Sequence, residues 1–290
     1  MRDHGRATAR TAGQALADDE IRRFVSLYPG EPGKLAHRLA GHPLLGLDAL
    51  ADAAGRMRPE NVLCHAAKNR NGAGFAPSEP PGQPIGETVR AIGSASRYVM
   101  LSLVEQLPEY AALMRETIGQ FEPAIRAHTG EPLQQRAFLF ISSPETLAPF
   151  HFDAEYNVLF QIAGRKDFVL YPPVAPWITD AANEHYHRTG DNLLPWDESF
   201  AGQGTRIVLE PGDALFVPYR WPHWVELGDE PSISLSFTWN SRAGFEQNDA
   251  YRLNAWLRRF GLSPASPAPL PARSPVRSVA WRALSRLHVA

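Results

Sequence analysis

The sequence has little of what would place it in several common classes of protein. It has one cysteine, Cys64, among 290 residues, which excludes an internal disulfide framework and fits a reducing compartment. No apolar run approaches the roughly 20 residues that cross a bilayer, and the first residues lack the apolar segment of a secretion signal. We therefore expect a cytoplasmic protein without a membrane partner.

Neither sign of charge is in excess. The 29 Lys and Arg residues nearly balance the 31 Asp and Glu residues, for a formal net charge of −2. Such a chain has no overall field that attracts nucleic acid, so no nucleic-acid partner is expected. Its length is sufficient for one domain with a sizeable core and some additions.

The first half of the chain carries mostly helical patterns. Residues 20–130 are expected to form a helical N-terminal region, with Asp48 as a plausible helix N-cap. Within it, residues 97–128 have apolar side chains at three- and four-residue spacing, interrupted at Pro108 and Pro123. The Gly- and Pro-rich segment between the helices, residues 69–87, predicts a loop or lid.

The middle of the chain, residues 131–242, changes to a period of two. Eight short runs follow one another there: QRAFLFISS, PFHFD, NVLFQIAG, KDFVLYPP, TRIVLE, DALFVP, HWVEL and SISLSFTW. Most are bounded by Gly, Pro, Asp or Asn, which is typical of antiparallel strands, and their number predicts a jelly roll of two Greek keys. A polar insertion, residues 174–204, is expected to leave the sheet. The fold class is therefore α+β: a jelly-roll barrel, or double-stranded β-helix, with a helical N-terminal wrapper and C-terminal helices.

The two ends of the chain are expected to be additions to this barrel. Residues 1–19 predict a leader without fixed structure, residues 243–261 a helix, and residues 262–275 a Pro-rich linker. Residues 276–290 predict an amphipathic helix. Its apolar face comprises Val276, Val279, Ala280, Ala283, Leu284 and Leu287. We expect this face to dock on a second subunit and form a homodimer, with docking on the helical wrapper of the same chain as the alternative.

One triplet could begin a metal site. Residues i and i+2 of a strand point to the same side, so His151 and Asp153 can offer an imidazole and a carboxylate to one point. With 10 histidines in the chain and aspartate at about one residue in twenty, roughly half of such sequences would contain a His-x-Asp by chance. Alone, the triplet indicates a polar strand end.

A second stretch, EPGDALFVPYRWPHWVEL at 210–227, changes this balance. It places His223 at the start of a predicted strand, between aromatic and apolar neighbours. The competing interpretation is a histidine of the core whose hydrogen bonds are all made within the protein. Together with His151 and Asp153, His223 completes a 2-His-1-carboxylate triad, which leaves three positions open on ferrous iron. The three residues predict an Fe(II) site and are the candidate catalytic residues.

Two further residues could hold an organic acid beside the metal. Lys166 begins the strand that follows the turn AGR, and its ammonium could enter the barrel, where a buried cation is costly unless it meets an anion. A solvated hairpin lysine is the alternative. Asn157 shares a strand face with Leu159 and Gln161, and it could donate to a metal-bound carboxylate.

The two stretches PFHFDAEYNVLFQIAGRKDFVLYPP and PGDALFVPYRWPHWVEL resemble the cupin-like JmjC group of iron(II)- and 2-oxoglutarate-dependent oxygenases. The likeness covers about residues 135–240. Within that group the chain is similar to the asparaginyl hydroxylase that acts on hypoxia-inducible factor, and more so to bacterial cupin-like proteins labelled transcriptional regulators.

The resemblance implies a set of roles and a reaction. His151, Asp153 and His223 would bind iron, Lys166 would pair with the C5 carboxylate of 2-oxoglutarate, and Asn157 would approach its metal end. The co-substrate would be oxidised to succinate and carbon dioxide while a C–H bond of the substrate is hydroxylated. Two positions depart from the hydroxylase: Ala148 stands where it has a threonine, and Ser236 or Thr238 where it has a late asparagine.

The substrate class stays open between a peptide or protein side chain and a small molecule. A function of another class is also compatible with a cupin barrel, namely a non-catalytic sensor or transcriptional regulator that binds a small ligand. The sequence shows no helix-turn-helix pattern, and a sensor does not require both the complete triad and Lys166.

Overall fold

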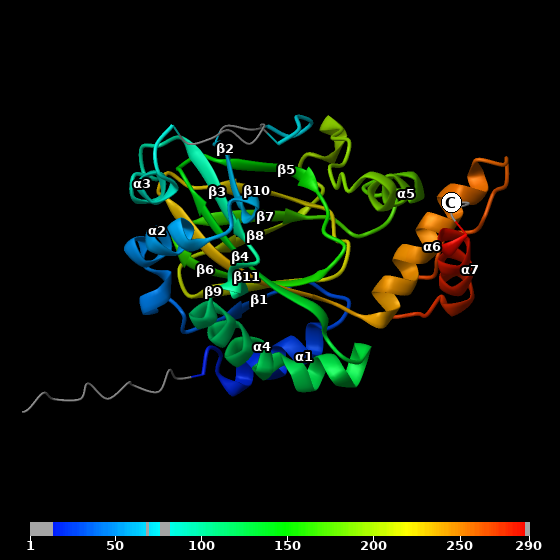
Figure 1. Cartoon of the computed structure of the whole chain (residues 1–290), viewed down its shortest axis with the longest axis horizontal. Coiled ribbons are helices and arrows are strands. Elements are labelled where there is room, and N and C mark those ends of the chain that lie inside the picture. Colours follow the sequence, from blue (N-terminus) through cyan, green and yellow to red (C-terminus); the bar gives the residue numbers. More distant parts are fainter. Residues whose placement is uncertain (1–13, 68–69, 76–81, 288–290) are drawn as a thin grey trace, which may run out of the picture.

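Two antiparallel sheets form the centre of the molecule in the computed structural model, which describes residues 14–67, 70–75 and 82–287 (Figure 1). The larger sheet has the strand order β1-β9-β6-β11-β4-β3-β2, and the smaller has the order β5-β10-β7-β8. All eight predicted strands are present: β4 Leu133–Ser142, β5 Leu147–His151, β6 Tyr156–Ala163, β7 Lys166–Leu170, β8 Thr205–Leu209, β9 Asp213–Val217, β10 His223–Leu227 and β11 Ser232–Asn240. The α+β jelly-roll prediction is confirmed.

The period-two pattern of the strands produces two separate cores. On β6, Tyr156, Val158 and Phe160 point outward into a large core shared with the helices, whereas Leu159 points inward. The inward core lies between the two sheets and comprises Leu159, Phe168, Leu170, Leu209, Leu215, Val217, Val225 and Leu227. Because this inner core is small, the remaining barrel interior can hold polar side chains and a ligand.

Helices cover the outside of the sheets. In Figure 1, α1 and α4 lie together along one side of the larger sheet, and α5, α6 and α7 gather at the opposite end from α2 and α3. The helical elements are α1 Asp18–Leu27, η1 Pro43–Leu45, α2 Leu47–Arg56, η2 Pro59–Asn61, α3 Ile85–Arg90, η3 Val104–Gln106, α4 Pro108–Thr129, α5 Asp180–Thr189, η4 Glu198–Phe200, α6 Arg242–Arg258 and α7 Pro275–Arg286. None of the helices in the described ranges is long and apolar enough to cross a membrane.

The N-terminal region, predicted as mostly helical, also contains three strands. These are β1 Gly33–Ala36, β2 Val62–Ala66 and β3 Arg97–Ser102. The helical prediction for residues 97–102 is wrong because β3 pairs with both β2 and β4, so the gain in sheet hydrogen bonds and burial decides its conformation. The strands β3 and β2 thereby extend the larger sheet past β4 and add a wall beside the barrel.

Two predicted helix boundaries also differ. Helix α2 begins at Leu47 with Gly46 at the N-cap, so Asp48 lies in the first turn instead. Pro123 does not interrupt α4, which continues from Pro108 to Thr129. A proline inside a helix costs about 3 kcal/mol, but Phe121 and Ile125 on either side of it are fully buried in the large core and hold the helix there.

The predicted leader, residues 1–19, lies outside the described residues as far as residue 13. For its last residues the prediction is wrong, because Leu16 is buried in the large core and α1 begins at Asp18. Residues 69 and 76–81 of the predicted loop at 69–87 also lie outside the described residues, and the loop ends earlier than predicted because α3 begins at Ile85. The insertion at 174–204 leaves the sheet as predicted and forms α5 and η4, apart from one bridge between Leu193 and His151.

The C-terminal helix α7 packs on α6 of its own chain. Ser278 and Arg282 of α7 both donate to Asp249 of α6, at 2.6 and 2.7 Å. Arg273, just before α7, pairs with Glu246 of α6. The predicted apolar face is largely left in solvent, because the side chains of Val276, Val279 and Leu287 are 81, 68 and 70% exposed.

Candidate metal centre

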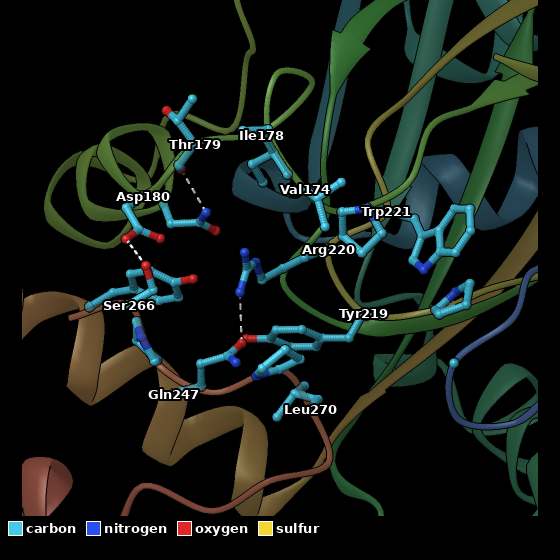
Figure 2. A pocket seen from close by; sticks show the side chains of 18 of the residues that line it. Val174, Ile178, Thr179, Asp180, Tyr219, Arg220, Trp221, Gln247, Ser266 and Leu270 are labelled. Atoms are coloured by element: carbon cyan, nitrogen blue, oxygen red, sulfur yellow. Dashed lines mark hydrogen bonds between the residues drawn. The ribbon is translucent and has the colours of Figure 1, made fainter. Parts of the chain in front are cut away.

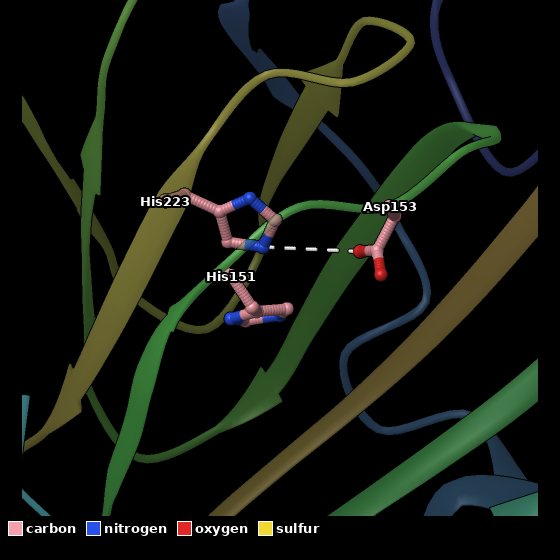
Figure 3. A group of neighbouring side chains, drawn as sticks. All are labelled: His151, Asp153 and His223. Carbon is pink, nitrogen blue, oxygen red and sulfur yellow. Dashed lines mark ion pairs between the residues drawn. The ribbon is translucent and has the colours of Figure 1, made fainter. Parts of the chain in front are cut away.

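The barrel brings together the three residues that the sequence predicts as metal ligands. His151 ends β5 and His223 begins β10, and the two are direct partners across the antiparallel pair. Asp153 follows two residues after His151, so its carboxylate turns to the same side (Figure 3). One ligand atom from each residue lies within 4.8 Å of the other two. In the described part of the chain, this is the one group of His, Cys, Asp and Glu side chains with such geometry.

Backbone carbonyls fix the orientation of both imidazoles. The Nδ1 atom of His151 lies 2.6 Å from the Pro149 oxygen, and the Nδ1 atom of His223 lies 2.9 Å from the Trp221 oxygen. A carbonyl only accepts, so each Nδ1 carries the proton and each Nε2 keeps its lone pair. The free lone pairs are thus available for a metal, in the manner of histidine ligands held by a second hydrogen bond.

The carboxylate of Asp153 is held beside them. Its Oδ2 lies 3.8 Å from Nε2 of His223, and its Oδ1 accepts from Nδ2 of Asn192 at 3.3 Å. The backbone carbonyl of Asp153 accepts from the backbone N–H of Arg220 at 2.9 Å, which ties the turn after β5 to the turn before β10. Both ligand-bearing segments are therefore fixed to each other as well as to the sheet.

Electrostatics keep the site ready for a cation. Burial, together with the neighbouring His151, lowers the pKa of His223 to about 4. The imidazole of His223 is therefore neutral at physiological pH and needs to lose no proton to bind a metal. Two imidazoles and one carboxylate, with open space on the cavity side, form the donor set that suits Fe(II).

Lys166 lies inside the barrel, as the first of its two interpretations predicted. It shares the inward face of β7 with Phe168, and it is 4% exposed. Its ammonium lies 5.7 Å from the centroid of the Phe140 ring. The ammonium donates to the Ser234 hydroxyl at 2.6 Å. It makes no ion pair with a carboxylate in the described part of the chain, and burial lowers its pKa to about 7.

Asn157 lines one cavity of about 370 Å³ together with His151 and Asp153. Its side-chain oxygen accepts from the Ser236 hydroxyl at 2.6 Å, so its amide nitrogen is left to donate into the cavity. The remaining lining is mainly apolar and aromatic: Leu63, His65, Phe75, Tyr98, Met100, Phe138, Phe140, Glu155, Asn192 and Thr238 complete it. Lys166 lies behind Phe140, next to this cavity.

The sequence interpretation missed several residues of the cavity. Ser234 and Ser236 position Lys166 and Asn157, and the alternation of serine with apolar residues in SISLSF was a signal for them, since it places three hydroxyls on one strand face. Ser236 had been considered only as the counterpart of a late asparagine. Tyr98 and Met100 had no such signal, because they belong to β3, which was predicted as helix.

Comparison with known proteins agrees with this fold. The model of the family described as the cupin-like domain matches residues 83–245, more than half of the chain, and the chain therefore belongs to the cupin-like domain family. Among curated proteins it is similar to the lysine-specific demethylase JMJ31 of Arabidopsis thaliana, 31% identical over 140 residues that span 44% of this chain and 25% of that protein.

Two other relatives extend the comparison. The tRNA wybutosine-synthesizing protein 5 of Danio rerio is 31% identical over 139 residues, 47% of this chain and 40% of that protein. Among solved structures, Escherichia coli ycfD has a TM-score of 0.51 at 17% identity, covering 92% of this chain and 67% of that chain, which shows a shared fold. The chain thus spans a quarter to two fifths of the curated relatives' length.

Proposed function

We propose that the chain is an Fe(II)- and 2-oxoglutarate-dependent dioxygenase that hydroxylates an unidentified peptide, protein or small-molecule substrate. The observation that carries this proposal is Lys166, a buried ammonium with no carboxylate partner in the described structure. It lies next to the cavity lined by His151 and Asp153, the two residues that form the candidate triad with His223. Burying an unpaired cation is costly, so a barrel that retains one is suited to an anionic ligand.

Each residue has a definite role in this proposal. His151, Asp153 and His223 would hold the iron and leave the cavity side of the ion open. Lys166, positioned by Ser234, would bind the distal carboxylate of 2-oxoglutarate. The amide of Asn157, positioned by Ser236, would donate to the carboxylate at the metal end. When bound, iron and 2-oxoglutarate supply the oxidising chemistry, which yields succinate, carbon dioxide and a hydroxylated substrate.

The walls of the cavity support a role in excluding water from that chemistry. Aromatic side chains line it from two sides: Phe138 and Phe140 from β4, Tyr98 from β3, and Phe75 from the loop before α3. The ring centroids of Phe75 and His151 lie 5.8 Å apart, so Phe75 lies directly against a metal ligand. The relatives' names, a demethylase and a tRNA-modifying protein, differ in substrate and leave that of this chain unassigned.

Two further parts of the proposal concern the whole chain. We place the protein in the cytoplasm, in keeping with its single, buried cysteine. We also propose a homodimer through the exposed apolar face of α7, since an apolar helix face left in water favours association.

Anaerobic titration tests the binding part of this proposal. Fe(II) and 2-oxoglutarate added together should give a visible metal-to-ligand charge-transfer band in the wild-type protein, and the band should be absent from Asp153→Ala. A wild-type protein that binds neither component would refute the assignment.

A further inference from the structure

A second cavity, of about 490 Å³, lies outside the barrel. It is bounded by the turn before β10, by α5 and α6, and by the extended segment at 266–270 (Figure 2). Tyr156 of β6 lines it from the outer face of the strand, whereas the adjacent Asn157 points into the metal cavity. The two cavities share no lining residue, and the volume of the second lies within the usual range for small-molecule sites.

Arg220 presents an unsatisfied cation to this second cavity. Its side chain is 9% exposed and points into the cavity (Figure 2). One Nη donates to Oε1 of Gln247 at 2.9 Å, and the guanidinium lies 4.9 Å from the ring centroid of Tyr251. Its Nε is buried without an acceptor, and the guanidinium pairs with no carboxylate in the described ranges. Neighbouring Arg258, in contrast, pairs with Glu184.

The backbone conformation of Arg220 indicates a functional role for its side chain. Its φ angle is +64°, in the left-handed region that glycine adopts without strain and arginine does not. A glycine would therefore serve the turn better than an arginine. The strain and the missing counter-ion both indicate that the guanidinium is held for a ligand.

The opposite wall of the cavity offers acceptors. Asn183 is 1% exposed and donates through Nδ2 to the Thr179 carbonyl at 2.8 Å, which leaves its buried Oδ1 without a donor. Asp180 lies one turn earlier on α5, where its carboxylate accepts from the Ser266 hydroxyl and faces the cavity (Figure 2). The N-terminus of α5 carries about half a positive charge, which by itself would repel a cation. The negative charge of the Asp180 carboxylate is larger, so this wall still attracts a cation. Apolar side chains, Val174, Ile178 and Leu270, lie on the rim and walls between the two sides.

We propose that this cavity is a second ligand site that binds a small apolar amino acid as its zwitterion. The carboxylate of the ligand would accept from Nε and one Nη of Arg220, a fork that matches carboxylate geometry. Its ammonium would donate to Asp180 and to Oδ1 of Asn183, and its side chain would contact the apolar walls. A phosphate or a simple carboxylate fits less well, because its charge would not be balanced at Asp180.

Calorimetric titration of the full chain with L-valine, L-leucine, L-methionine and L-phenylalanine tests this site. At least one should bind, and for L-leucine the matched probes are 4-methylpentanoate, which lacks the ammonium, and 3-methylbutylamine, which lacks the carboxylate. Each should bind about tenfold more weakly or worse, since each leaves one charged partner unmet. Absence of binding by all four amino acids at millimolar concentration, or equal binding of 4-methylpentanoate, would overturn the proposal.

Variants assign the binding to this cavity. Arg220→Gly removes the guanidinium and relieves the backbone strain, so it should fold and lose amino-acid binding about tenfold or more, as should Asp180→Asn. Lys166→Met should leave amino-acid binding unchanged while it weakens 2-oxoglutarate binding, which separates the two sites. Unaltered amino-acid affinity in a folded Arg220→Gly protein would refute the assignment.

Discussion

Lys166 differs from the other described lysine, Lys34, in having no carboxylate. Lys34 is 41% exposed and pairs with Asp213 at 2.6 Å, whereas the ammonium of Lys166 is buried against Ser234. At the scale of single residues, this contrast separates a cation that contributes to stability from one that is held for a ligand.

The Lys166→Met variant should therefore change binding and stability in opposite directions. Loss of the ammonium should weaken 2-oxoglutarate binding by about 2–4 kcal/mol, because the distal carboxylate would be left unpaired in the barrel. The ligand-free protein should become more stable, because a desolvated charge is removed. Calorimetry and thermal unfolding measure the two effects.

Lys34→Met is the matched control for this prediction. It should leave 2-oxoglutarate affinity unchanged and should not raise stability, because its ammonium is solvated and paired. If Lys166→Met retained wild-type affinity, the anchor of the co-substrate would have to lie elsewhere.

The pH dependence of binding follows from the same residue. Burial lowers the pKa of Lys166 to about 7, so its ammonium form dominates below that pH and the amine above it. A bound carboxylate favours the ammonium, so 2-oxoglutarate affinity should be highest below about pH 7 and fall by up to about tenfold per pH unit above it. Titrations in several buffers should also show proton uptake on binding at pH 8, and a flat profile would contradict the role of Lys166.

The stability of the ligand-free protein should depend on pH in the opposite direction from 2-oxoglutarate affinity. The folded-state pKa of Lys166 lies below the ordinary lysine value, so the unfolded chain binds more protons between about pH 7 and 10.5. The contribution of this group to the free energy of unfolding of the ligand-free protein should therefore rise with pH across that window. Lys166→Met should remove this contribution.

Substitution of a metal ligand should abolish activity completely. His223→Ala and Asp153→Ala should each abolish iron binding and 2-oxoglutarate consumption while circular dichroism stays close to wild type, because an open coordination sphere needs all three ligands. His185→Ala is the control, since His185 lies on α5 with its side chain 46% exposed. Wild-type turnover in either ligand variant would refute the triad.

At the scale of elements, the barrel strands could be predicted and the N-terminal strands could not. Each of the eight barrel strands has its own alternation and turn residues, which are local signals. The strand β1 has four residues. Only the short helix η3 separates β3 from the long helix α4, so the pattern of β3 merged with that of α4. Their conformations depend on pairing with strands distant in the sequence, which local periodicity does not contain.

The same reasoning holds for the site. His151, Asp153, His223, Lys166 and Asn157 could be proposed from the motifs, and the barrel places the first three together and Lys166 and Asn157 inward. The residues of β2 and β3 that line the cavity could not be proposed from the sequence, because these two strands were not predicted.

Helix α7 carries the prediction for assembly. Its polar contacts with α6 leave Val276 and Val279 in solvent, so the double variant Val276→Glu/Val279→Glu should not disturb α6–α7 packing. If the apolar face forms the proposed dimer, light scattering should show a dimer for the wild type and a monomer for this variant. Val25→Glu, at a 41% exposed valine of α1, is the control and should remain dimeric. A monomeric wild-type chain would refute the dimer.

At the scale of the whole molecule, the turn before β10 contributes to both the metal centre and the second cavity. The backbone of Arg220 bonds to the Asp153 carbonyl, while its side chain enters the second cavity, and the Trp221 carbonyl holds His223. The residues that orient the metal ligands thus also line the proposed amino-acid site. A rigid two-sheet frame with short connecting turns allows both arrangements to be fixed at once.

The measurement that tests the central claim most directly is succinate formation by the purified protein. Wild-type protein supplied with Fe(II), 2-oxoglutarate and oxygen, without substrate, should convert 2-oxoglutarate to succinate slowly, and Asp153→Ala should not. A non-catalytic sensor would bind 2-oxoglutarate without forming succinate. Iron-loaded wild-type protein that binds 2-oxoglutarate and yields no succinate above the Asp153→Ala background would contradict the account.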